Sequence, residues 1–143
     1  MRRSRRAVAL TCAAPLLLGA CGGLRDGNPT ESLALKVVSI ELGRVVGADK
    51  RVLEHTARFS PGDTVYASVV TEGNVDLAVL EAHWSRGDTL VGEARQQIAS
   101  DGDAVTEFHV FDPSGLPPGT YRVDVLLDGT PVGSREFTVE AAT

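Results

Sequence analysis

The chain is poor in the residues that hold very small secreted proteins together. It has two cysteines among 143 residues, and aromatic side chains make up only 5% of it. Its apolar runs stay well below the roughly 20 residues that a membrane-spanning helix needs. Its 15 glycines do not follow a collagen repeat. These features exclude a disulfide-rich mini-protein, a collagen-like chain and a spanning helix, and the length predicts one globular domain.

Sequence motifs of common catalytic sites are absent as well. There is no Gly-x-Ser-x-Gly around a nucleophilic serine, and no Gly-x-Gly-x-x-Gly or P-loop pattern for phosphates. The Asp-rich turns, such as Asp101-Gly102-Asp103, lack the alternating ligands and bidentate Glu of calcium loops. We therefore expect no enzymatic activity and no cofactor.

The first residues have the pattern of a secretory signal. Basic residues up to Arg6 precede an apolar run over 7–18, which is too short to span a bilayer. The run ends in Leu18-Gly19-Ala20-Cys21, which resembles the lipobox of bacterial lipoproteins. The resemblance implies a signal peptide over 1–20 and lipid on Cys21, with membrane attachment through at least two acyl chains. An ordinary cleaved signal or an N-terminal anchor helix is the alternative.

Gly22, and not Asp, follows Cys21. By analogy with lipoprotein sorting, this predicts the outer membrane facing the periplasm in a Gram-negative host, and otherwise the outer face of the plasma membrane. Residues 21–32 read as the lipidated cysteine and a flexible Gly-, Pro- and Ser-containing tether.

Removal of residues 1–20 would make the remaining chain clearly acidic. Of the 14 basic residues, four arginines leave with the signal, so 10 remain against 19 acidic residues, a net charge of −9. Such a surface repels phosphate backbones, so we expect no nucleic acid partner. No free thiol would remain, because Cys12 is removed and Cys21 carries lipid.

Residues 33–140 alternate between β-branched runs and turn dipeptides such as Pro61-Gly62 and Asp128-Gly129. This spacing predicts antiparallel strands without room for helices. The predicted strands are Leu35–Leu42, Thr64–Thr71, Val75–Ser85, Thr89–Ala99, Ala104–Phe111, Thr120–Leu127 and Val132–Glu140. About seven strands in one domain is the number of an immunoglobulin-like β-sandwich.

The pattern of apolar and polar residues predicts the secondary structure of some segments more clearly than that of others. The last two predicted strands alternate with period two and meet at Asp128-Gly129, which predicts a hairpin with a type I′ turn. The segment Asp76–Trp84 alternates poorly and fits either a strand with a bulge or a short helix. Residues 44–58 fit either an edge hairpin or a long loop.

The immunoglobulin-like fold is also indicated by Gly119-Thr-Tyr-Arg-Val123. This segment resembles the tyrosine corner, with Tyr121 in the tyrosine position and Val123 in the position of the second core cysteine. Trp84 falls on the third predicted strand, where the fold often buries a tryptophan. The disulfide is missing, and the first cysteine position falls at Val65, Ala67 or Val69. The resemblance is one of architecture and carries no function.

Three histidines are the only candidates for metal binding. His55, His83 and His109 have no His-x-His or His-x3-His spacing that would set two ligands together. We expect His83 and His109 to point away from the apolar face of their strands. A periplasmic metal-binding or small-ligand-binding protein that uses these histidines is therefore an alternative function, with solvated strand histidines as the simpler interpretation.

The segment Asp112–Gly119 contains three prolines in eight residues. Leu116, Pro117 and Pro118 could form a rigid contact surface at one end of the sandwich, or they could only carry the chain between the sheets. The sequence predicts a membrane-anchored, non-enzymatic binding or accessory module for an envelope protein or polymer. Inhibition of an envelope protease is a further alternative.

Overall fold

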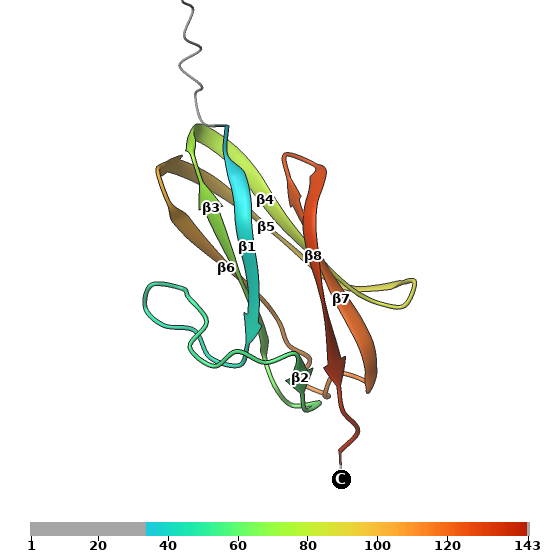
Figure 1. The fold of residues 1–143 in the computed structure, drawn as a ribbon. Coiled ribbons are helices and arrows are strands. Elements are labelled where there is room, and N and C mark those ends of the chain that lie inside the picture. Colours follow the sequence, from blue (N-terminus) through green and yellow to red (C-terminus); the bar gives the residue numbers. More distant parts are fainter. Residues whose placement is uncertain (1–33, 143) are drawn as a thin grey trace, which may run out of the picture. The chain divides into compact units, whose positions relative to one another are not determined.

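The computed structural model describes residues 34–142, and these residues form strands and loops without a helix. The predicted signal peptide, Cys21 and the tether lie outside the described residues. Within 34–142, no helix is long and apolar enough to cross a membrane. The eight strands are β1 (Lys36–Gly43), β2 (Arg58–Phe59), β3 (Val65–Glu72), β4 (Asn74–Arg86), β5 (Thr89–Asp101), β6 (Ala104–Val110), β7 (Gly119–Leu127) and β8 (Thr130–Val139) (Figure 1).

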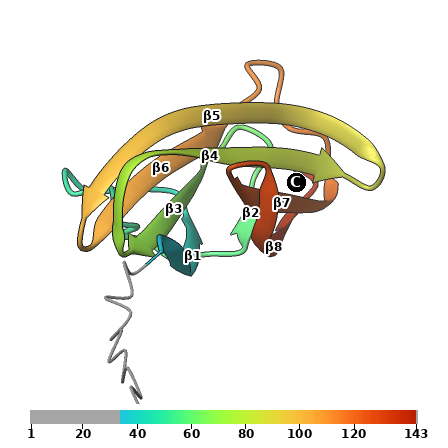
Figure 2. The same ribbon diagram turned by 90° about the horizontal axis from the view of Figure 1, so that it is seen from above.

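The strands form two sheets that face each other. One sheet has the order β1-β3-β6 and the other the order β2-β8-β7-β4-β5 (Figure 2). All pairings are antiparallel except that of β2 with β8. The predicted β-sandwich is confirmed, and each of the seven predicted strands has its counterpart with ends within two residues. The eighth strand, β2, has only two residues and was not predicted.

The core lies between the sheets and is built by the alternation of side chains along each strand. On β7, Tyr121, Val123 and Val125 are at most 1% exposed, whereas Arg122 points outward. A cluster of aromatic rings surrounds Phe137 on β8. Its ring stacks on Tyr121 at 5.2 Å between centroids and meets Trp84 and Phe59 edge-on at 5.9 and 5.4 Å. Such geometries favour aromatic pairs beyond their buried area.

The uncertain segments are settled by the pairing. Residues 76–84 belong to β4, and the register shifts between Val75 and Ala78, so the predicted bulged strand is confirmed. Asp128 and Gly129 both have positive φ, 49° and 82°, as the predicted type I′ turn between β7 and β8 requires.

The segment 44–57 is a loop that folds back on itself. Two isolated bridges join Gly43 to His55 and Val46 to Val52. The carbonyl of Lys50 accepts a hydrogen bond from the hydroxyl of Ser68, which is fully buried on β3. The loop therefore covers part of the outer surface of the three-stranded sheet.

The strand directions define two ends of the domain (Figure 1). We call the end where β1 begins the entry end, which also carries the turns at 73, 102 and 128–129. We call the opposite end the distal end, which carries the loops 44–57, 60–64 and 111–118. Every residue of the core cluster lies between Ile40 and Val139, so the compact unit Glu31–Thr143 contains the whole core.

Candidate functional site

The tyrosine corner is present at the start of β7. The Tyr121 hydroxyl donates a hydrogen bond to the carbonyl of Pro117, with 2.6 Å between the oxygens. Burial of the phenol raises the pKa of Tyr121 above its ordinary value. Val123 and the three alternative positions for the first cysteine are all fully buried, so apolar packing occupies the place of the disulfide. The hydrogen bond and the burial are those that a tyrosine corner at Tyr121 requires.

Leu116 does not form the exposed contact surface that the sequence analysis considered. Its side chain is only 3% exposed and belongs to the core cluster, and its backbone N–H donates to the carbonyl of Pro61 at 2.7 Å. Pro117 and Pro118 remain exposed. The contact surface considered for this loop was wrong for Leu116. Its backbone hydrogen bond to Pro61 holds the loop against the core, and the sequence does not show this contact because the two residues are far apart in the chain.

Trp84 is buried, a point that its place on the third predicted strand had left open. Its side chain is 1% exposed, and its Nε1 has no hydrogen-bond partner among the described residues. The indole packs below Gly92 of β5, where an added Cβ would lie 3.7 Å from Trp84 Cδ1. Trp84 is thus a core residue and not part of an exposed binding surface.

The three histidines lie on separate elements. His83 lies on the outer face of β4 with Nε2 3.1 Å from the carboxylate of Glu81, and His109 lies on β6 of the other sheet with Nδ1 2.7 Å from Glu107. His55 lies in the loop 44–57. No three His, Cys, Asp or Glu side chains within 34–142 are arranged to hold a metal ion.

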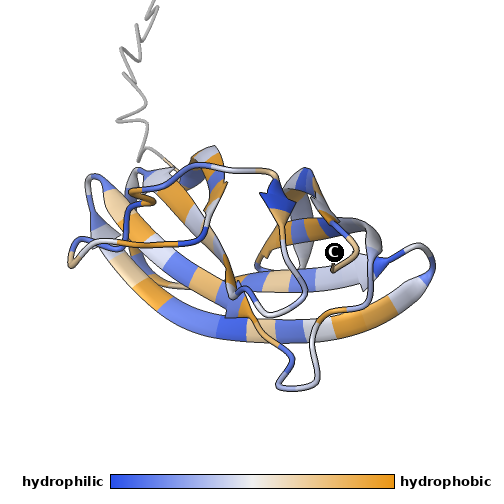
Figure 3. Cartoon of the chain, turned by 90° about the horizontal axis from the view of Figure 1, so that it is seen from below, coloured by the Kyte–Doolittle hydropathy of each residue, from blue (hydrophilic) through white to orange (hydrophobic). Residues whose placement is uncertain are grey.

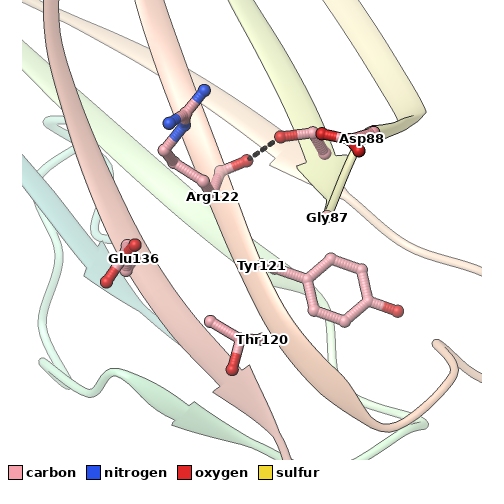
Figure 4. A pocket seen from close by; sticks show the side chains of 7 residues that line it. Gly87, Asp88, Thr120, Tyr121, Arg122 and Glu136 are labelled. Atoms are coloured by element: carbon pink, nitrogen blue, oxygen red, sulfur yellow. Dashed lines mark hydrogen bonds between the residues drawn. The ribbon is translucent and has the colours of Figure 1, made fainter.

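The outer face of the five-stranded sheet is polar and carries two shallow hollows. One, of about 300 Å³, lies over the ends of β4, β7 and β8 (Figure 4), where Ser85 Oγ donates to the carbonyl of Arg122 at 3.5 Å. The other, of about 240 Å³, lies over β4 and β5. Ion pairs join Arg95 to Glu81 at 3.2 Å and Arg122 to Asp124 at 3.0 Å. The charges on this face are therefore largely paired with each other, as on a solvated sheet face.

Exposed aliphatic side chains gather in the loop 44–57 at the distal end. Leu53 is 67% exposed and Val45 is 45% exposed, and the Leu53 N–H donates to the Val45 carbonyl at 2.9 Å. We call these two residues the loop pair. Figure 3 views the domain from this end. The sequence analysis did not single out the loop pair, although two apolar residues in a charged loop were the signal that it offered.

A network of hydrogen bonds and ion pairs centred on Arg44 holds the loop that carries the loop pair. Its guanidinium bonds to Asp63 at 2.8 Å, to Glu54 at 3.3 Å and to the carbonyl of Arg58 at 2.7 Å. The hydrogen bond from Arg44 and that from the Ser60 backbone hold the pKa of the Asp63 carboxyl below its ordinary value. The hydrogen bond to Asp63 and, after it, the ion pair with Glu54 raise the pKa of Arg44. This network ties the loop 44–57 to the loop 60–64.

Comparison with known proteins gives the fold and nothing more specific. No protein family and no curated protein matches the sequence. An immunoglobulin-like protein from Pseudomonas aeruginosa matches with a TM-score of 0.52 and 12% identity, over 77% of this chain and 99% of that one. A cycloisomaltooligosaccharide glucanotransferase from Paenibacillus matches with a TM-score of 0.51 and 16% identity, over 76% of this chain.

An alkylpurine DNA glycosylase from Pseudomonas fluorescens matches with a TM-score of 0.47 and 17% identity, over 75% of this chain. The matched regions are 14% of the glucanotransferase and 30% of the glycosylase, so this chain spans only a minor part of either enzyme. At these identities the likeness concerns architecture alone. The fold defines the chain as an immunoglobulin-like β-sandwich without a disulfide.

Proposed function

We propose that this protein is an envelope lipoprotein, attached to a membrane through lipid on Cys21, whose domain binds a protein partner without catalysis. The attachment is supported by the Leu18–Cys21 segment, which follows a basic start and an apolar run of signal-peptide length. Residues 22–32 would act as the tether to the domain. Membrane attachment therefore has its support in the sequence alone.

The binding role is carried by one observation, the exposed loop pair at the distal end. Single exposed apolar side chains are common, but neighbouring ones form a patch, and apolar patches mark sites of protein–protein interaction. The loop pair lies at the end of the domain opposite to the start of β1, and so away from the point where a tether would join the domain. A partner in the periplasm, or outside the cell, could reach it there.

A protein partner fits this surface better than an envelope polymer. The loop pair is aliphatic, and the rings of Trp84, Tyr121 and Phe137 are buried, so Phe111, which is 51% exposed, is the exposed large ring among the described residues of the distal end. The loop pair itself therefore offers apolar area for a protein interface and no flat ring for stacking on a sugar. The acidic net charge further disfavours anionic polymers.

Attachment is tested with the Cys21→Ser variant of the full chain. Metabolic labelling with palmitate should mark the wild-type protein and not the variant, and the wild-type protein should fractionate with membranes. An unlabelled wild-type protein would refute lipidation. This result is independent of the binding role, because the domain folds around its own core.

Binding is tested with two matched variants of the full chain, Leu53→Ser and Leu77→Ser. The two leucines are exposed to nearly the same extent, 67% and 63%, but Leu77 lies at the entry end. In-cell cross-linking followed by mass spectrometry should capture a specific envelope protein with the wild type and with Leu77→Ser, and lose it with Leu53→Ser. Equal capture by both variants would exclude the loop pair as the docking surface. A captured protease would favour the inhibitor alternative.

A further inference from the structure

The strand β5 forms an open edge of the five-stranded sheet. It has 13 residues and pairs only with β4, so its second edge has no strand partner within residues 34–142. Strands at sheet edges are templates for pairing with another chain, and proteins protect them with charged side chains such as lysine, with proline, with β-bulges or with inward-pointing charges. β5 has neither lysine nor proline, its bulge lies at Val91, and over Gly92–Ile98 its inward-facing side chains are uncharged.

Other edges of the sandwich are engaged by side chains. Arg135 Nε donates to the carbonyl of Ile40 at 3.0 Å and so connects β8 with β1. Gln96 Nε2 donates to the carbonyl of Glu107 at 2.6 Å and so occupies the edge of β6. No comparable contact occupies the edge of β5 among the described residues. The edge of β5 is therefore open to pairing with another strand.

The charges on β5 are complementary to those of a second copy in antiparallel register. In an antiparallel pair, residues that lie directly opposite each other point to the same face of the sheet. A two-fold axis between two copies of one strand therefore passes midway between one residue and the same residue of the second copy. An axis at Glu93 or at Arg95 would set two like charges directly opposite. An axis at Ala94 instead sets Glu93 opposite Arg95 of the second copy, twice in the dimer. Cross-strand pairs of opposite charge stabilise a sheet, whereas like pairs destabilise it.

The geometry of β5 limits the pairing to the residues around this axis. Val91 has no partner on β4, because Trp84 pairs with Gly92 and Ser85 pairs with Leu90. The regular alternation of inward and outward side chains along β5, followed from Ile98 back toward Thr89, therefore ends at Gly92. The loop 111–118, drawn in orange, projects past the line of β5 in the view from above (Figure 2). With the two-fold axis at Ala94, a pairing that begins at Gly92 on one copy ends at Gln96 on the other by symmetry.

The side chains that would pair are free to do so. Glu93 is exposed on the outer face, and Arg95, whose side chain is 69% exposed, uses only one of its nitrogens for the ion pair with Glu81. A second copy would thus extend the ion pair between Arg95 and Glu81 into a network across the dimer. Arginine is suited to this role because its guanidinium donates in several directions.

We propose that two copies of this chain associate through antiparallel pairing of β5 over Gly92–Gln96, with Ala94 on the two-fold axis and Glu93 opposite Arg95 in both halves. Because this interface is small, the dimer is weak and forms only where the concentration of the chain is high. If the chain is anchored as proposed above, confinement to one membrane raises that concentration. The pairing itself does not depend on the anchor.

The test uses Glu93→Arg and Arg95→Glu in the segment 31–143, studied by sedimentation velocity at up to about 500 µM. Each variant alone sets like charges opposite each other and should dimerise about tenfold more weakly than the wild type. In an equimolar mixture, one variant is positive at both positions and the other is negative at both, so opposite charges face each other again and dimerisation should be restored. A wild type that stays monomeric, or a mixture no better than its components, would overturn the proposal.

A matched control separates this register from general charge attraction. Arg58→Glu and Glu140→Arg alter an exposed ion pair of 3.5 Å near β2, at the other side of the same sheet. Each of these variants alone should dimerise like the wild type, and so should their mixture. Weaker dimerisation of either control, equal to that of the β5 variants, would contradict the assigned edge.

A second measurement does not depend on charge. In the segment 31–143, which has no cysteine of its own, Ala94→Cys places a thiol on the two-fold axis, and under a mild oxidant in solution it should give a dimer that reducing agents separate. Ala99→Cys, on the same strand, should not, because its mate in this register is Thr89. Dimers of equal yield from both variants, or from neither, would contradict the proposed axis.

Discussion

Replacement of Tyr121 by phenylalanine isolates the hydrogen bond of the tyrosine corner. The change removes one oxygen and leaves the ring, so the stacking on Phe137 at 5.2 Å is retained. What is lost is the hydrogen bond of 2.6 Å to the carbonyl of Pro117. The difference in free energy of unfolding therefore measures how strongly this bond fixes the loop 111–118 to β7.

The expected magnitude follows from the surroundings of the two oxygens. The Tyr121 side chain is buried, but Pro117 is exposed, so its carbonyl can turn to water when the hydroxyl is removed. A hydrogen bond lost without leaving a fully buried, unsatisfied group costs about 1 kcal/mol. For a domain of this size, such a loss lowers the melting temperature by about 4 °C.

The assay is urea unfolding followed by the fluorescence of Trp84, which is the only tryptophan in the chain. The matched control is Tyr66→Phe, because the Tyr66 hydroxyl makes no hydrogen bond with the described residues and its ring lies beside His109 on the outer face. We expect Tyr66→Phe to change the free energy of unfolding by less than about 0.5 kcal/mol. Equal losses in the two variants would refute the assignment of the corner bond as a stabilising contact.

Three further substitutions test other parts of the fold. Trp84→Ala removes the largest buried side chain and should lower the free energy of unfolding by about 3 to 5 kcal/mol, measured by circular dichroism because the fluorescent reporter is lost. Gly43→Ala would overlap a backbone carbonyl and a valine methyl of the following loop, and should cost about 1 to 3 kcal/mol in urea unfolding, whereas Gly62→Ala, with open space around it, should cost far less. The pKa of Asp63 is held below 3.8 by Arg44 in the folded state, so its stabilising effect is present above that pH and is lost as the pH falls through the folded pKa. Asp63→Asn should therefore unfold in urea with a free energy that falls less than that of the wild type between about pH 4 and pH 2.

The strands could be predicted because turn-forming residues mark their ends in the sequence. Asp128-Gly129 and Gly102 adopt positive φ at the predicted places, since aspartate tolerates and glycine favours that backbone conformation. The two-residue β2 could not be predicted, because it exists only through parallel pairing with the far end of the chain. The burial of Leu116 escaped prediction for the same reason, since it depends on the bond to Pro61. Local patterns predicted local structure, and contacts between distant loops did not follow from them.

The same distinction explains why the candidate binding surface was missed. Leu53 lies opposite Val45 because the loop 44–57 turns back at Gly47–Lys50 and is bridged from Gly43 to His55 and from Val46 to Val52. The turn residues were compatible with a hairpin, but nothing local showed that both apolar side chains would stay exposed.

Arg44 then fixes the turned loop by its bonds to Asp63 and to the Arg58 carbonyl, and its guanidinium lies 5.6 Å from the centre of the Phe59 ring. Because Phe59 also packs edge-on against Phe137, the loop is connected directly to the aromatic centre of the core. A surface held in this way loses little conformational entropy when a partner covers it, and this lowers the cost of association. Docking at Leu53, as proposed, would therefore depend on Arg44 as well, although Arg44 need not contact the partner. A folded Arg44→Ala variant should capture the partner more weakly and, without any partner, should show faster amide hydrogen exchange in the loop 44–57 than the wild type. Weaker capture with unchanged exchange would instead indicate direct contact between Arg44 and the partner.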